Sequence, residues 1–153
     1  MNTATPIAVR LATADDVPIL VDMMVDFNRG EQIAWTPREG EPALRTLLGD
    51  QSLGLVGLCE ADGATVGYFV LTYGYDLEWN GRDAFLTELY LVPSSRRRGL
   101  GPTVLRRIEV VAKEKGVRAL HLMVRPENKA AKRLYEGAGY VSPPRIFLSK
   151  ELG

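Results

Sequence analysis

The fold is decided by the stretch FLTELYLVPSSRRRGLG, residues 85–101. Its first part is apolar and β-prone, which predicts a strand over 85–92. Two glycines then follow an arginine-rich loop, and a helical pattern begins at once. Backbone N–H groups at the start of that helix would point at the mouth of the loop. The stretch therefore predicts an anion-binding site between a strand and a helix.

A cluster of arginines surrounds this loop: Arg96, Arg97, Arg98, Arg106 and Arg107. Cations are disfavoured at a helix N-terminus, so the cluster suggests that a bound polyanion compensates their charge. The loop lacks the Lys-Ser/Thr of a nucleotide-binding P-loop, and it lacks the three glycines and acidic residue of a dinucleotide fingerprint. Nucleotide binding through this loop is therefore disfavoured.

Length and composition limit the remaining choices. A chain of 153 residues is long enough for one domain with a sizeable core and too short for two ordinary domains. Its 19 basic and 19 acidic residues balance, so the overall charge implies neither a nucleic-acid partner nor an anionic membrane.

The cysteine content and the hydropathy of the chain indicate in which cellular compartment to expect the protein. Cys59 is the only cysteine, which excludes a disulfide framework and gives no metal-ligand set. The N-terminal residues lack the pattern of a signal peptide, and no apolar run reaches the length of a membrane span. We expect a cytoplasmic protein without a metal.

Hydrophobic periodicity and turn signals predict the elements around the central stretch. Before it, we expect a strand over 7–11, helices over 13–30 and 36–48, and hairpin strands over 53–60 and 65–75. After it, we expect a helix over 103–115, a strand over 120–124, a helix after Asn128 and a final strand near 145–149. Strand, loop, helix and strand form a βαβ unit, so the strands over 85–92 and 120–124 should be parallel neighbours.

Several motifs together resemble one known family. Arg96-x-x-Gly99-x-Gly101 is similar to the acyl-CoA pyrophosphate loop of the GNAT superfamily of N-acyltransferases. Three further segments match the GNAT core in order and spacing: Leu89-Tyr90-Leu91-Val92-Pro93, Leu120-His121-Leu122 and Asn128-Lys129-Ala130-Ala131-x-x-Leu134-Tyr135-x-x-x-Gly139-Tyr140. The stretch 68–88 is most similar to the diamine acetyltransferase branch. The resemblance implies a single α/β (α+β) domain over 1–153, with a mixed, twisted central sheet and helices on both faces.

The resemblance also implies acetyl-CoA as cosubstrate. The residues that it assigns to CoA binding are Leu89, Tyr90, Leu91, Arg96, Arg97, Arg98, Gly99, Leu100, Gly101 and Asn128. The N–H groups of Leu89 and Leu91 would polarise the thioester carbonyl and pair with pantetheine. Tyr135 matches the family tyrosine that can protonate the departing sulfur. Pro102 lacks the N–H that this loop position usually gives to phosphate. Dimers are common in the diamine branch, so by analogy a homodimer is one possible state, and the sequence leaves the oligomeric state open.

The chemistry needs a proton acceptor. An alkylamine has a pKa of about 10.4, so roughly one molecule in two thousand is the free base at pH 7. The usual acid of the diamine branch aligns with Thr87, and Glu88 is the nearest carboxylate. Adjacent strand residues face opposite sides, so Glu88 needs a bulge to face the acceptor. A water relay or Glu31 are the alternatives.

The acceptor should bind between the loops 28–37 and 76–83. Glu31 would attract a cationic amine, and Trp35, Tyr73 and Tyr75 would line the pocket. The resemblance implies direct acetyl transfer to a primary amine, and we expect a small or polyamine-like acceptor. A protein lysine or N-terminus is an alternative acceptor. A non-catalytic acyl-CoA-binding sensor is the alternative class, and Thr87 keeps it open.

Overall fold

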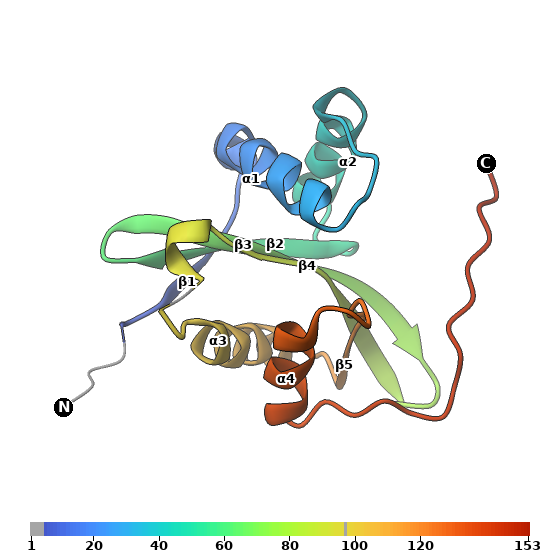
Figure 1. The fold of residues 1–153 in the computed structure, drawn as a ribbon. Coiled ribbons are helices and arrows are strands. Elements are labelled where there is room, and N and C mark those ends of the chain that lie inside the picture. Colours follow the sequence, from blue (N-terminus) through green and yellow to red (C-terminus); the bar gives the residue numbers. More distant parts are fainter. Residues whose placement is uncertain (1–4, 97) are drawn as a thin grey trace. The chain divides into compact units, whose positions relative to one another are not determined.

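The computed structural model describes residues 5–96 and 98–153 (Figure 1). Their contacts form two compact units, one that ends at Met123 and one over Val124–Gly153. The single domain over 1–153 stays a prediction.

The first unit is built on a five-stranded sheet in the order β1-β2-β3-β4-β5. The strands are β1 Ala8–Leu11, β2 Gly54–Ala61, β3 Ala64–Asp76, β4 Gly81–Leu91 and β5 Ala119–Leu122. Neighbours are antiparallel from β1 to β4, whereas β4 and β5 are parallel. The predicted mixed sheet and its parallel pair are therefore confirmed.

Helices cover both faces of this sheet, as predicted. The helical elements of the unit are η1 Ala14–Asp16, α1 Val17–Gly30, α2 Pro37–Gly49, η2 Pro93–Ser95 and α3 Gly101–Glu114. Figure 1 shows α1 and α2 on one face and α3 on the other. The connection through α3 crosses from β4 to β5, as a parallel pair requires.

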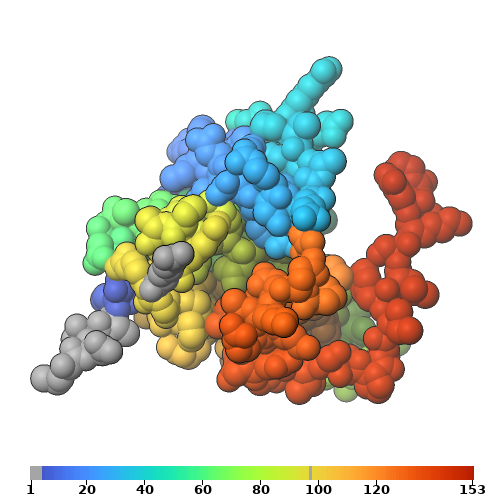
Figure 2. All heavy atoms as spheres, viewed as in Figure 1, coloured from blue at the N-terminus to red at the C-terminus, as the bar shows by residue number. Residues whose placement is uncertain are grey.

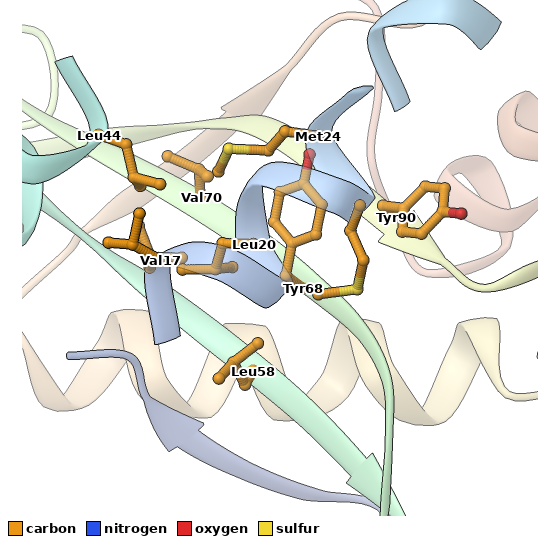
Figure 3. Packing of buried hydrophobic residues seen from close by; sticks show 10 residues of the cluster. Val17, Leu20, Met24, Leu44, Leu58, Tyr68, Val70 and Tyr90 are labelled. Atoms are coloured by element: carbon orange, nitrogen blue, oxygen red, sulfur yellow. The ribbon is translucent and has the colours of Figure 1, made fainter. Parts of the chain in front are cut away.

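A buried hydrophobic cluster holds α1 and α2 on their face of the sheet. Figure 3 shows Tyr68 and Tyr90 among side chains from both helices. Val17 and Leu20 of α1 have no exposed surface, and Leu44 of α2 is 5% exposed. Full burial of each such aliphatic side chain contributes about 1.5–3 kcal/mol. This packing gives β3 and β4 a rigid support.

The second unit contains α4, Lys129–Gly137. The side-chain oxygen of Asn128 accepts a hydrogen bond from the Ala131 N–H at 3.1 Å, so Asn128 caps this helix as predicted. The rings of Tyr135 and Tyr140 meet edge to face, with centroids 5.8 Å apart.

The predicted strand near 145–149 is wrong. The chain after α4 forms no helix or strand, and Ile146 and Leu148 are 87% and 86% exposed. Pro143 and Pro144 precede this segment, and a proline has no N–H for a strand ladder. The apolar residues alone were therefore insufficient to indicate a strand.

Candidate functional site

The loop after β4 turns the chain into α3. Gly99 has φ +66°, the left-handed conformation that favours glycine. Leu100 is 3% exposed and anchors the loop in the core, and α3 starts at Gly101. Pro102 lies in the first turn, where its missing N–H costs no helix hydrogen bond. The loop therefore presents a helix N-terminus, as predicted. Arg97 lies outside the described residues.

The other two arginines of the loop bind to the protein. Arg96 Nε donates to the Leu91 carbonyl at 2.8 Å, and its guanidinium lies 5.2 Å from the centre of the Tyr90 ring. Arg98 Nη2 donates to Asp62 Oδ2 at 3.1 Å. Figure 2 shows the loop, in yellow, on the surface beside the green β2–β3 turn. Arg96 and Arg98 thus hold the loop in place, whatever else they bind.

The edge of β4 changes along its length. Pairing with β5 ends at Leu86 and Leu122, and β4 continues to Leu91. The Val92 N–H donates to the Val66 carbonyl beside β3 at 2.8 Å. Because strand amides alternate in direction, the N–H groups of Leu89 and Leu91 point to the opposite edge, beyond the end of β5.

A bulge decides where Glu88 lies. Val70 pairs with Glu88, but the next residue, Leu71, pairs with Leu86, so Thr87 is an extra residue in β4. Paired residues share a face, and the bulge puts Glu88 on the face of Val70, toward α1 and α2. The bulge that the sequence analysis required for Glu88 is present.

Glu88 is held by a hydrogen bond from a core tyrosine. The Tyr68 hydroxyl donates to Glu88 Oε1 at 2.6 Å, and the whole Tyr68 residue is buried. Burial raises the pKa of Glu88, and the hydrogen bond from Tyr68 opposes this in part. Burial and the neighbouring carboxylate also raise the pKa of Tyr68. Glu88 is thus an oriented carboxylate with an increased affinity for a proton.

Tyr90 joins the loop to α1. Its hydroxyl donates to Asp26 Oδ2 of α1, and Arg96 lies over its ring. Burial, with the hydrogen bond to Asp26, raises the pKa of Tyr90 to about 12. This tyrosine is therefore a neutral anchor at ordinary pH.

The structure separates the predicted acceptor residues. Glu31 follows the last residue of α1, and Trp35 packs over Gly40, where an added Cβ would lie 2.1 Å from the Trp35 ring. Tyr73 and Tyr75 lie on the face opposite Glu88, because their register partners on β4 alternate with those of the Glu88 face.

The surroundings of Tyr73 and Tyr75 differ. The guanidinium of Arg82 lies 4.4 Å from the centre of the Tyr73 ring. Tyr73 also lines a cavity of about 620 Å³ together with Arg82 and Lys115. Tyr75 is 76% exposed. Neither tyrosine is brought to Glu88.

Two residues that the sequence analysis did not assign come together on the Glu88 face. Asp83 of β4 and His121 of β5 form a hydrogen-bonded pair. Each is an ionisable residue inside a largely apolar strand, and this pattern could have marked each of them as a candidate site residue. Their pairing depends on the register of two strands distant in sequence, and one residue alone does not reveal it.

Tyr135 and Asn128 belong to the second unit, where both lie at α4. Among residues 5–96 and 98–153, no three His, Cys, Asp or Glu side chains gather as metal ligands. No helix in this part of the chain is long and apolar enough to cross a membrane.

Curated relatives match part of the chain. Thialysine N-epsilon-acetyltransferase of Bos taurus is 35% identical over 74 residues, 48% of this chain and 43% of the relative. The same enzyme of Mus musculus is 32% identical over 80 residues, 52% of this chain and 47% of the relative. The match thus spans less than half the length of these two relatives. The Caenorhabditis elegans enzyme is 25% identical over 131 residues, 85% of this chain and 80% of the relative.

Solved structures and a family model agree with the fold. An integron cassette protein from the mobile metagenome of Cole Harbour Salt Marsh superposes with a TM-score of 0.82 at 31% identity, over 95% of this chain and 90% of the other. A Clostridium acetobutylicum protein, described as a predicted acetyltransferase and solved with acetyl-CoA, has a TM-score of 0.77 at 18% identity, over 95% and 96%. Residues 20–140 match the model of the acetyltransferase (GNAT) family. The chain therefore belongs to the GNAT family of acetyltransferases.

Proposed function

We propose that this chain transfers an acetyl group from acetyl-CoA directly to a primary amine, with a small or polyamine-like amine as acceptor. The observation that carries the proposal is the bulge at Thr87. It turns the Glu88 carboxylate to one face of β4, within a few residues of a strand edge whose amides can receive a substrate. Family membership supports the acetyl donor.

Acetyl-CoA would bind at the edge of β4 and at the start of α3. The N–H groups of Leu89 and Leu91 would donate to pantetheine and to the thioester carbonyl, stabilising the oxyanion that forms there. The pyrophosphate would lie at the N-terminus of α3, beside Gly99 and Gly101. Asn128 and Tyr135 complete the proposal, Asn128 as a CoA contact and Tyr135 as the acid for the leaving thiolate.

Glu88 would take a proton from the amine nitrogen as the C–N bond forms. Its raised pKa suits this role, because a carboxylate in water is a weak base. The hydrogen bond from Tyr68 occupies Oε1, so Oε2 is the atom offered to the substrate. Cys59 is poorly suited to form a covalent acetyl intermediate, because burial raises its pKa to about 12, and this supports direct transfer.

The acceptor class rests on the relatives. Three of them are named for acetylation of thialysine at N-epsilon. Glu31 and Trp35 both lie in the connection between α1 and α2, and both are proposed to contact the acceptor. Tyr73 and Tyr75 would contact the acceptor only if it is long enough to reach past the edge of the sheet to the opposite face. The homodimer and the cytoplasmic location stay predictions.

Release of free thiol from acetyl-CoA tests the proposal. The purified chain would be incubated with pools of polyamines, thialysine and lysine, aminoglycosides, and lysine or N-terminal peptides. We expect release that depends on the polyamine or thialysine pool. Release with peptides alone would overturn the small-amine acceptor. No release from any pool, with acetyl-CoA still raising the melting temperature, would favour a sensor.

A further inference from the structure

A second proton-accepting centre lies on the sheet face that carries Glu88. His121 Nε2 and Asp83 Oδ2 are 3.0 Å apart, and the two side chains are 28% and 11% exposed. A carboxylate only accepts hydrogen bonds, so Nε2 carries the hydrogen in this pair. The neutral ring then has its lone pair on Nδ1. The pair therefore offers one proton acceptor, fixed by a largely buried carboxylate.

Neighbouring residues hold this pair in place. The centroid of the Phe85 ring lies 5.2 Å from that of His121, and the Trp79 ring lies 6.0 Å away. Gly74 makes room for the carboxylate, because an added Cβ there would lie 2.6 Å from Asp83 Oδ1. The orientation of His121 is thus determined from several sides.

The pair lies where β4 and β5 separate. His121 is paired with Phe85, and the next pair, Leu86 with Leu122, is the last. Phe85 pairs with Thr72 and Glu88 with Val70, so the bulge puts Phe85 and Glu88 on one face. Asp83 is thus the acidic partner of His121 on β4, and Glu88 is the next ionisable residue along the same face. Thr87, between them, has no group that accepts a proton at neutral pH.

Acetyl transfer to an amine requires the removal of two protons. At neutral pH the acceptor is mostly an ammonium ion, which must lose one proton before its nitrogen can attack. The nitrogen loses a second proton as the C–N bond forms and the C–S bond breaks. One proton ends on the CoA thiol and the other leaves to solvent. A single carboxylate would have to serve twice.

We propose that His121, oriented by Asp83, removes the first proton from the acceptor ammonium, and that Glu88 takes the second. This inference rests on the proposed function. Nδ1 of His121 receives the proton and later returns it to water, which its partial exposure permits. Asp83 is a positioning residue, because it holds the tautomer and stabilises the imidazolium without touching substrate.

The pH dependence of kcat/KM separates the two roles. We expect His121→Gln to lower kcat/KM about 100-fold at pH 7, because general base catalysis is lost. The deficit should disappear as the pH approaches the pKa of the amine, where the acceptor is already neutral. Glu88→Gln should keep its deficit at every pH. The proposal would be overturned if the loss of kcat/KM in His121→Gln were the same at every pH, or if this variant showed no loss at all.

Asp83→Asn should show the same pH-dependent loss in smaller measure. Asp22→Asn, an exposed change on α1, is the matched control and should resemble the wild type.

NMR gives a readout that does not depend on activity. His121 is the only histidine, so its ring nitrogen signals need no assignment by mutation once any tag is removed. We expect the neutral ring to carry its hydrogen on Nε2, and Asp83→Asn to shift the population toward Nδ1–H. A neutral wild-type ring with its hydrogen on Nδ1 would overturn the proposal. Failure of the proposed function would appear instead as an inactive wild type with the expected tautomer.

Discussion

The two faces of β4 have different compositions and different tasks. Toward α3, the apolar residues Leu86 and Leu89 of β4 lie in register with Leu71 and Phe69, and Arg82 is a charged residue of β4 at the far end of this face. Toward α1 and α2, the same strand carries Asp83, Glu88 and Tyr90, each hydrogen-bonded to another side chain. Both faces contribute to the core, but these side-chain hydrogen bonds of β4 lie on the face toward α1 and α2, and one extra residue, Thr87, sets the face on which Glu88 lies.

The largest effect should follow from changing the polar face. Glu88→Gln should reduce kcat/KM by about 10²- to 10⁴-fold, because the amide cannot accept a proton. Acetyl-CoA should still raise the melting temperature, since the loop and the N-terminus of α3 are unchanged. Steady-state kinetics and thermal shift measure both quantities. Glu114→Gln, exposed on α3, is the control, and equal activity of the two variants would remove Glu88 from the reaction.

A change behind the apolar face should act on stability alone. Ile108 of α3 has no exposed surface, so Ile108→Ala should lower the free energy of unfolding by about 2–5 kcal/mol. Val110 on the same helix is 51% exposed, and Val110→Ala should change the free energy of unfolding by less than about 0.5 kcal/mol. Urea denaturation measures both. If Ile108→Ala lost activity per folded molecule, the division between the faces would be wrong.

The smallest effect concerns the pH dependence of stability. The pKa of Glu88 is raised in the folded protein, so the unfolded chain releases this proton at lower pH. As the pH rises from the unfolded-state pKa of Glu88 to its folded-state pKa, the wild type should therefore lose stability relative to Glu88→Gln. At low pH, where the Glu88 carboxyl is protonated in both states, the two proteins should differ least in stability. Melting curves of both proteins at pH 4 to 8 measure this difference in stability, and each kcal/mol should shift the melting temperature by about 2–4 °C. A difference that shrinks as pH rises would contradict the raised pKa.

Sequence patterns predicted the elements well where two signals agreed. Thr36 and Pro37 marked the start of α2, Asn128 marked that of α4, and the hairpin turn at Asp62 and Gly63 joined two strands. The stretch 145–149 had only apolar residues in its favour, after a pair of prolines, and it formed no strand. A single favourable signal was insufficient there.

The candidate site was only partly predictable. The loop and its helix follow from local spacing, whereas the partner of Arg98, Asp62, is distant in sequence and no local pattern indicates it. Glu88 could be named but not oriented, because a bulge is a property of two strands together. Asp83 and His121 are separated by the whole of α3, and their contact is decided by strand register.

The bulge in β4 also affects how related chains should be compared. By resemblance, Thr87 stands where the diamine acetyltransferase branch usually has its acid, so a search that tests this position alone would classify the chain as inactive. Because Thr87 is an extra residue in β4, the alternation of residues along the strand does not by itself tell which face of the sheet carries Glu88. The face of a carboxylate near such a bulge therefore has to be read from the pairing of the two strands. Searches for active members should accept a carboxylate at the position of Thr87 or of Glu88 wherever the neighbouring strand has a matching irregularity.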